Sequence, residues 1–277
     1  MHRLVNKLKQ EAYTKIFVTR PRPQNIKLQK QLIDYFAVNG AGFPVVSLPL
    51  IEIVPHGEQF EAIAIHQALI QTEWVSFVSP NAFMMTHQLL KKHGLVWPSH
   101  LKIAVVGGGT ESSILQSGLA FQQIVKPLES GSWDSEGLWD ALTNAQPQWN
   151  DVKVVMIHGD GGRNFLAEKF ADCGAKIQEF SVYRRDCLSL DDPAWQEVDA
   201  NESSVWVFNS SQAAEFLIQG LQKLDINPLF LKKQLAIVSH PRILENVLKL
   251  GFTETKLIDP GDENLMKELL HIIKTAL

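Results

Sequence analysis

The stretch "SVWVFNSSQAAEF" (residues 204–216) joins a short apolar run directly to a helical pattern. Its first part, "VWVF", is continuously hydrophobic, which is typical of a strand buried on both faces of a parallel sheet. After it, apolar residues recur with the spacing of one helix face, at Ala214, Leu217, Leu221 and Leu224. Ser210 and Ser211 stand at the junction, with no lysine, histidine or glycine-rich turn beside them. The stretch therefore predicts a buried strand that leads into an amphipathic helix.

The same alternation recurs along most of the chain. Five further apolar runs each lead into a helical pattern: "KIFVTR" (15–20), "WVSFVS" (74–79), "KIAVVG" (102–107), "VKVVMIHG" (152–159) and "QLAIVS" (234–239). Buried strands that alternate with helices predict an α/β fold in which helices cover both faces of parallel sheets.

The chain also contains an internal repeat. "WVSFVSPNAF" (74–83) and "VWVFNSSQAA" (205–214) share the strand–serine–helix plan, so that Ser79 matches Ser210. "LKIAVVGGGTESSILQSGLAF" resembles "KQLAIVSHPRILENVLKLGF", and "KIFVTRPRPQN" resembles "KVVMIHGDGGRN" more loosely. Each pair is separated by about 130–140 positions. A repeat of this length predicts two related α/β domains rather than a solenoid.

Two extended segments interrupt the alternation. "VVSLPLIEIVP" (45–55) and "KIQEFSVYRRDC" (176–187) are rich in β-forming residues, and each follows a strand–helix unit that ends in glycine. They fit two arrangements equally well. In the first arrangement, each segment is a strand of its own sheet. In the second, the two segments pair with each other as a two-stranded connector.

The composition excludes several classes of protein. The chain has 277 residues, of which 45% are hydrophobic and 20% charged, enough for about two domains. A net charge of −4 argues against a general nucleic-acid or membrane surface. The polar start "MHRLVNKLKQEAYTK" lacks the apolar core of a secretion signal, and no apolar run approaches the roughly 20 residues of a membrane helix. Cys173 and Cys187 are the two cysteines, which favours a reducing cytoplasm.

Candidate site residues cluster where the predicted strands end. In open parallel sheets, ligands bind beyond these ends, where helix N-termini attract anions. The residues there are polar, small or basic: Thr19, Arg20, Ser79, Asn81, Gly107 to Thr110, His158 to Arg163, Ser210, Ser211 and Ser239 to Arg242. Two such rims facing each other would form a cleft for a ligand with many carboxylates or phosphates. The histidines lack metal-ligand spacing, so we expect no metal site.

Each candidate also has a structural explanation. Ser79 precedes Pro80, which is a common helix start, and Ser210 and Ser211 are open to the same explanation. "VVGGGTESS" (105–113) lacks the P-loop lysine and the third glycine of GxGxxG. "HGDGGR" (158–163) either holds an acid group through Arg163 or is a glycine-rich turn with a solvated arginine.

Taken in order, the strand ends resemble those of the uroporphyrinogen-III synthase family over about residues 15–260. No single motif is specific, and the resemblance rests on the ordered set. The stretches that carry it are "VTRP" (18–21), "PLIEI" (49–53), "FVSPNA" (77–82), "AVVGGGT" (104–110), "GDGGR" (159–163), "VYRRD" (182–186) and "FNSS" (208–211).

The resemblance implies a fold of two similar three-layer α/β domains joined by a two-stranded β connector. One domain would be discontinuous, formed by residues 1–48 and 185–277. The other, residues 52–180, would be inserted into it, with the connectors at about 49–53 and 180–185. Such enzymes are monomers.

The resemblance also implies a reaction, the dehydrative cyclisation of the linear tetrapyrrole hydroxymethylbilane with inversion of ring D. The product would be uroporphyrinogen III of the tetrapyrrole and haem pathway, made by a cytoplasmic lyase. No cofactor, nucleic acid or membrane is implied, and the one protein partner would be the preceding enzyme, in transient contact.

By position, Tyr183 matches the family's suggested general acid, and an ordinary phenol is protonated at neutral pH. Ser79, Thr110, Ser210 and Ser211 match residues that line the cleft. Two positions depart from the family pattern. His158 stands where the family often has arginine, and "VSHPR" (238–242) replaces a turn that usually contains glycine and threonine.

Two other functions remain open from the residues alone. A non-catalytic protein with two lobes that close on a small anionic ligand would bind tightly without turnover. A nucleotide-dependent α/β enzyme would need a phosphate motif, and the incomplete glycine motifs argue against it.

Overall fold

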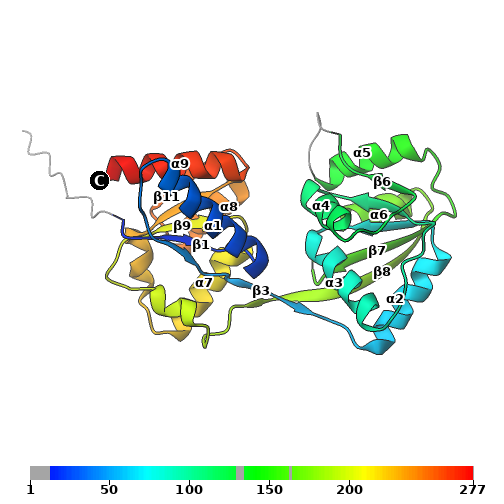
Figure 1. Cartoon of the computed structure of the whole chain (residues 1–277), viewed down its shortest axis with the longest axis horizontal. Coiled ribbons are helices and arrows are strands. Elements are labelled where there is room, and N and C mark those ends of the chain that lie inside the picture. The colour runs from blue at the N-terminus through cyan, green and yellow to red at the C-terminus, as the bar shows by residue number, and fades with distance from the viewer. Residues whose placement is uncertain (1–12, 129–133, 162–163, 277) are drawn as a thin grey trace, which may run out of the picture. The chain divides into compact units, whose positions relative to one another are not determined.

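The structure is a computed structural model that describes residues 13–128, 134–161 and 164–276. The chain divides into two compact units (Figure 1). The first, here called the split unit, comprises Met1–Glu52 and Asp186–Leu277. The second, the inserted unit, comprises Ile53–Arg185. Within the described ranges, no helix is both long and apolar enough to cross a membrane.

The split unit contains a five-stranded sheet in the order β11-β10-β9-β1-β2, and every neighbouring pair is parallel. Its strands are β1 (Ile16–Val18), β2 (Val45–Ser47), β9 (Val205–Phe208), β10 (Leu235–Val238) and β11 (Glu254–Leu257). Its helices are α1 (Arg22–Val38), α7 (Ser211–Lys223), α8 (Pro241–Leu250) and α9 (Asp262–Ala276), with short 3-10 turns at Pro193–Glu197 and Pro228–Lys233.

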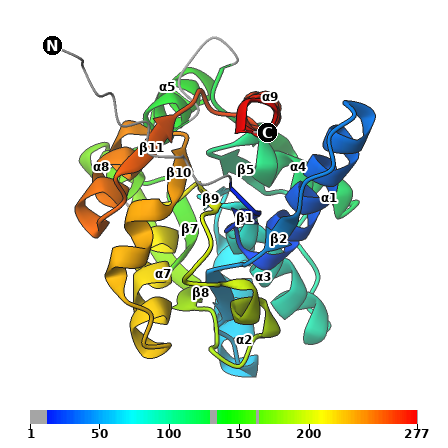
Figure 2. The same cartoon turned by 90° about the vertical axis from the view of Figure 1, so that its left-hand side faces the viewer.

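Helices cover both faces of this sheet, with α1 and α9 on one face and α7 and α8 on the other (Figures 1 and 2). Alternation along β1 assigns its side chains to the two layers. Ile16 and Val18 are buried in the cluster that includes Leu28 of α1. Phe17 points the other way and stacks on Trp206 of β9, with ring centroids 4.2 Å apart. Strands buried on both faces explain the unbroken apolar runs in the sequence.

The inserted unit contains a six-stranded sheet in the order β3-β8-β7-β4-β5-β6. Its strands are β3 (Ile51–Pro55), β4 (Trp74–Phe77), β5 (Lys102–Val105), β6 (Gln123–Val125), β7 (Lys153–Gly159) and β8 (Lys176–Cys187). Its helices are α2 (Gln59–Gln71), α3 (Pro80–Lys92), α4 (Gly108–Gln116), α5 (Ser135–Ala145) and α6 (Phe165–Asp172). The strands from β8 to β6 are parallel to their neighbours.

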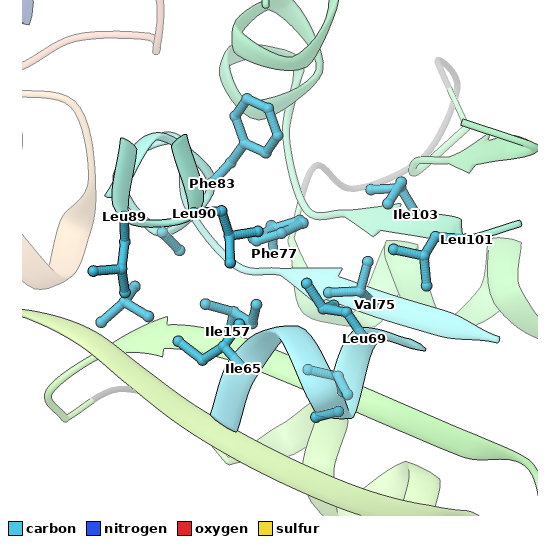
Figure 3. Packing of buried hydrophobic residues seen from close by; sticks show 14 of the residues in the cluster. Ile65, Leu69, Val75, Phe77, Phe83, Leu89, Leu90, Leu101, Ile103 and Ile157 are labelled. Atoms are coloured by element: carbon cyan, nitrogen blue, oxygen red, sulfur yellow. The ribbon is translucent and has the colours of Figure 1, made fainter. Parts of the chain in front are cut away.

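Two core clusters lie on opposite faces of this second sheet. Figure 3 shows the cluster against α2 and α3, in which Phe77 of β4 meets Phe83 of α3 edge-to-face at 5.5 Å. Trp74, three positions earlier on β4, belongs to the other cluster, with Leu138 of α5 and Phe170 of α6. The unit is therefore a three-layer sandwich, and the predicted α/β fold class is confirmed.

The two strand orders correspond to the sequence repeat. The order β6-β5-β4-β7-β8 of the inserted unit matches β11-β10-β9-β1-β2 of the split unit, position by position. In this match β4 is equivalent to β9, β5 to β10, and β7 to β1. These are the three pairs of segments that are similar in sequence. Ser79 and Ser210 accordingly occupy the same place, at the N-cap of the helix that follows the middle strand.

The two extended segments combine the two arrangements that the residues left open. Strand β8 pairs with β7 in parallel as an ordinary sheet strand, and it also neighbours β3. His56 N donates to Val182 O at 2.9 Å and Leu188 N donates to Leu50 O at 3.2 Å, so β3 and β8 run antiparallel. The chain passes between the units within these two strands. The segment 45–55 is divided at 48–50, so that β2 belongs to one sheet and β3 to the other.

Candidate functional site

A hollow of about 530 Å³ lies at the carboxyl ends of β4, β5 and β7, within the inserted unit. Small or apolar residues form part of its wall, including Val78, Val106 and Met156. Its polar side chains come from separate elements: Ser79, Ser135, His158, Asn164, Glu179 and Arg185. This position, beyond the strand ends, is the one at which open parallel sheets bind ligands.

Ser79 is the N-cap residue of α3. Its backbone is extended, with φ −157° and ψ 157°, and Pro80 follows at the first helical position. The Ser79 Oγ accepts a hydrogen bond from Ala82 N at 3.1 Å, which satisfies one of the free donors of the first turn. The same oxygen lies 3.1 Å from the Tyr183 hydroxyl. Ser79 is therefore both a helix cap and a partner of the tyrosine.

Tyr183 lies behind the wall of the hollow, with 1% of its surface exposed. Its ring lies against the backbone of Gly159, where the β7–β8 register shifts after His158. Asp160 N then donates to Tyr183 O at 2.7 Å. The bulge and the glycine together make room for a large ring inside the sheet.

Arg185 also contacts the phenol oxygen. Its Nη2 donates to the Tyr183 hydroxyl oxygen at 3.2 Å, and its guanidinium carbon lies 5.6 Å from the tyrosine ring centroid. Arg185 also lines the hollow. A guanidinium in this place attracts anionic ligands.

His158 and Glu179 form a second polar pair in the hollow. The His158 Nε2 lies 3.2 Å from a Glu179 carboxylate oxygen, and its Nδ1 lies 2.9 Å from Gly159 O. Both partners are acceptors, so a protonated ring can donate to both at once. Where the resemblance implies an arginine, the chain therefore has a histidine beside a carboxylate.

Asp160 anchors the end of β7. The Ser181 hydroxyl, and after it the His56 imidazole, hold the pKa of the Asp160 carboxyl below its ordinary value. His56 Nε2 lies 3.0 Å from Asp160 Oδ1, and Ser181 Oγ donates to the same oxygen. These contacts tie the turn after β7 to β8 and to the residue that follows β3.

The remaining predicted residues of the inserted unit lie at the same strand ends, but their environments differ. Asn81 is partly buried in the first turn of α3. Gly107 is the N-cap of α4, and a Cβ there would meet no atom within 4 Å, so space does not require a glycine. Thr110 is 2% exposed, and its N donates to Gly107 O at 3.0 Å. Arg163 lies outside the described residues.

The split unit has its own hollow, of about 790 Å³, at the ends of β9 and β10. Its polar wall includes Asn209, Ser210, Ser211, His240, Arg242 and Lys249. The His240 Nδ1 accepts from Arg242 N at 3.1 Å and so caps α8. His240 therefore caps α8 with its side chain, as Ser79 caps α3.

Thr19 and Arg20 are occupied by contacts within the split unit. The Thr19 hydroxyl donates to Val207 O at 2.7 Å and is 1% exposed, so it joins β1 to β9. Arg20 donates to Asn209 Oδ1 at 3.0 Å and to Asp262 Oδ1 at 2.6 Å. Arg20 is therefore paired with a carboxylate, and a substrate carboxylate would have to share or replace Asp262 as its partner.

Ser210 and Ser211 differ from each other. Ser210 is the N-cap of α7 but its side chain makes no capping hydrogen bond. The Ser211 Oγ is buried and has no hydrogen-bond partner among the described residues. Ser210 is therefore the better placed of the two to offer its hydroxyl to a ligand.

Sequence reasoning singled out neither Arg185 nor Glu179. A signal for Arg185 was present, because residues two apart on a strand share a face and Arg185 is two positions after Tyr183. No local pattern marks Glu179, whose role depends on the pairing of β7 with β8.

In the described parts of the chain, no group of three or more His, Cys, Asp or Glu side chains is placed to hold a metal ion.

Fold and site together define a class: a protein of two α/β units with parallel sheets, connected through two strands, with polar hollows at the strand ends. The model of the family described as uroporphyrinogen-III synthase HemD matches residues 35–256. The chain belongs to this family, as its ordered motifs predicted.

Individual relatives agree with this assignment. The chain is 29% identical to the uroporphyrinogen-III synthase of Proteus mirabilis over 171 residues, which are 61% of this chain and 79% of that protein. It is 24% identical to the Salmonella typhimurium enzyme over 261 residues, which cover 92% of this chain and 99% of the relative.

Solved structures of the same family share the fold. The Helicobacter pylori uroporphyrinogen-III synthetase has a TM-score of 0.60 at 12% identity, covering 93% of this chain and 99% of that one. A mutant Thermus thermophilus uroporphyrinogen III synthase has a TM-score of 0.54 at 10% identity, covering 95% and 99%.

Proposed function

We propose that this chain is a uroporphyrinogen-III synthase, a lyase that cyclises hydroxymethylbilane with loss of water and inversion of ring D. Membership of the family supports the reaction. The observation that carries the proposal in the structure is a buried tyrosine hydroxyl, held by a serine and an arginine at the wall of a polar hollow.

The substrate supplies most of the electronic driving force. Loss of its hydroxyl as water leaves an azafulvene cation stabilised by the pyrrole nitrogen. Ring D attacks through its substituted carbon, and the resulting spiro intermediate fragments and recloses with that ring reversed. The protein must fold the tetrapyrrole, exclude the direct closure, and protonate the departing hydroxyl. We assign Tyr183 as the source of that proton.

The substrate also carries eight carboxylates, and its binding requires many donors. In the inserted unit we assign this role to Ser79, Asn81, Gly107, Thr110, Arg163 and the helix N-termini beside them. In the split unit we assign it to Arg20, Ser210 and Ser211, with Thr19 positioning β1 against β9. The charged contact at Arg185 adds one cationic group that sequence reasoning did not include.

The setting of the enzyme is part of the proposal. We infer a monomer in the reducing cytoplasm that receives hydroxymethylbilane in transient contact with the preceding enzyme. Both cysteines are free, Cys173 exposed and Cys187 partly buried, as such a compartment permits.

Isomer analysis tests the proposed reaction. Hydroxymethylbilane is generated in situ by the preceding enzyme, and the cyclic products are separated after oxidation. The proposal requires the type III isomer to dominate over the type I isomer, which forms spontaneously. Type I alone at high concentrations of this protein would refute it, and tight binding of the tetrapyrrole without turnover would indicate a binding protein instead.

A further inference from the structure

We propose that Ser79 delivers the proton to the leaving hydroxyl and that Tyr183 acts through Ser79 rather than on the substrate directly. This relay rests on the proposed synthase function. It changes the assignment of the catalytic residue, which becomes the serine at the wall of the hollow. Tyr183 and Arg185 then become positioning residues behind it.

Of the two hydroxyls, that of Ser79 faces the hollow and that of Tyr183 is buried behind it. Ser79 and Arg185 line the hollow, whereas Tyr183 is 1% exposed and belongs to the apolar cluster of the inserted unit. The tyrosine hydroxyl and the serine hydroxyl lie 3.1 Å apart, which is within proton-transfer distance. A substrate atom in the hollow therefore reaches the Ser79 oxygen before it reaches the phenol.

The directions of the hydrogen bonds around Tyr183 and Ser79 leave the serine proton free for the substrate. Arg185 has only donors, so the Tyr183 oxygen accepts from it at 3.2 Å. A phenol proton in this buried place needs a partner, because an unbonded buried polar group costs about 1–3 kcal/mol. Among the residues that the structure describes, Ser79 Oγ is the acceptor within reach. That oxygen already accepts from Ala82 N at 3.1 Å, so the serine's own proton is free to point into the hollow.

The step is balanced in protons and electrons. The Ser79 Oγ–H bond breaks as its proton moves to the oxygen of the substrate's hydroxymethyl group. The Tyr183 proton moves to Ser79 Oγ, the C–O bond breaks with its electron pair on oxygen, and water leaves. Tyr183 is then a phenolate beside the Arg185 guanidinium, which stabilises its charge. After ring closure, the proton lost when ring D regains aromaticity returns through Ser79 to the phenolate.

Capping and proton transfer can be separated by substitution at Ser79. Asparagine caps a helix as well as serine does but has no transferable proton, whereas threonine provides both an acceptor and a hydroxyl. We expect Ser79→Asn to lower kcat about 100-fold, at the low end for loss of a general acid, with KM changed less than about threefold. Ser79→Thr should restore kcat to within about fivefold of the wild type, because it returns the hydroxyl.

Double substitution tests whether the two hydroxyls act as one unit. Tyr183→Phe should lower kcat by the same factor as Ser79→Asn, and the double variant should be no slower than either single variant. The control is Asn227→Ala, which removes a cap from a 3-10 turn in the split unit and should leave kcat unchanged. Circular dichroism verifies that each variant is folded.

Two results would overturn the relay while leaving the synthase function intact. One is a Ser79→Asn variant with wild-type kcat beside a slow Tyr183→Phe variant, which would show that the phenol acts directly. The other is a double variant whose losses multiply. A wild-type protein that makes only the type I isomer would instead refute the proposed function itself.

Discussion

The ring of Tyr183 fills the space that a side chain on Gly159 would need. A Cβ built at Gly159 would lie 2.3 Å from Tyr183 Cζ and 2.4 Å from Cε2. Real Cβ atoms do not approach other atoms so closely, and the ring cannot move easily because it is buried. Glycine is therefore required at position 159 because of the tyrosine ring, and not because of a bound phosphate or a positive φ angle.

Gly159→Ala is expected to displace the tyrosine and to destabilise the inserted unit by about 1–3 kcal/mol, the usual cost of overpacking. It should also lower kcat, because the Tyr183 hydroxyl moves away from Ser79. Urea denaturation and the isomer assay measure the two effects. Gly42→Ala is the matched control, since a Cβ there would meet nothing within 4 Å. Equal stability of the two variants would show that the ring adapts.

Gln234 is the second position with a large expected effect. It is fully buried, and its Oε1 accepts from Ser204 N at 2.9 Å and from Trp206 Nε1 at 3.1 Å. Its Nε2 donates to two backbone carbonyls, Glu202 O and Phe230 O.

Gln234→Leu would leave these groups unpaired inside the split unit, and each unsatisfied buried group costs about 1–3 kcal/mol. We expect a loss of at least about 3 kcal/mol in the free energy of unfolding, measured by urea denaturation. The control Gln222→Leu lies on the exposed side of α7 and should change stability by less than about 0.5 kcal/mol. A loss below 1 kcal/mol at Gln234 would mean that water or a shift of the backbone replaces the lost bonds.

The sequence predicts the features of this fold that depend on local pattern. Continuous apolar runs predict strands buried on both faces, and Phe17 and Trp206 occupy such positions in the structure. The repeat pairs Ser79 with Ser210, and both are helix N-caps. These inferences succeed because strand burial and helix starts are determined by neighbours in the chain.

Features that depend on distant pairing are not visible in the sequence. The glycines of "HGDGGR" suggest a turn, whether or not it holds an acid group, yet Gly159 belongs to β7 and faces a ring 24 positions later in the chain. Thr19 looks like a free hydroxyl at a strand end, but its proton is bound to a carbonyl of β9. Strand β8 has two neighbours, β7 and β3, and periodicity cannot assign either partner.

The stability of the inserted unit should depend on pH through Asp160. The Ser181 hydroxyl is the largest cause of the lowered pKa, followed by the His56 hydrogen bond. Because the pKa is lower in the folded state, the contribution is complete above the unfolded value of about 3.9 and is lost as the pH falls through the folded pKa.

Urea midpoints measured between pH 3 and 7 check this dependence. Asp160→Asn should be less stable than the wild type near neutral pH, and the difference should shrink in acid. Ser181→Ala should weaken the same pH dependence, because it removes the first cause. A constant difference between wild type and Asp160→Asn across the range would contradict the coupling.

The two serines at the start of α7 should have unequal roles. Ser210 makes no side-chain cap bond and lines the hollow of the split unit, so its hydroxyl is available to a substrate carboxylate. The Ser211 Oγ is buried without a partner among the described residues, so its removal costs no hydrogen bond there. We expect Ser210→Ala to raise KM several-fold, about the worth of one hydrogen bond, with kcat nearly unchanged. Ser211→Ala should change KM less and should leave the urea midpoint unchanged or raised. Steady-state kinetics on hydroxymethylbilane and urea denaturation measure both variants, and a larger KM effect at Ser211 would reverse the assignment.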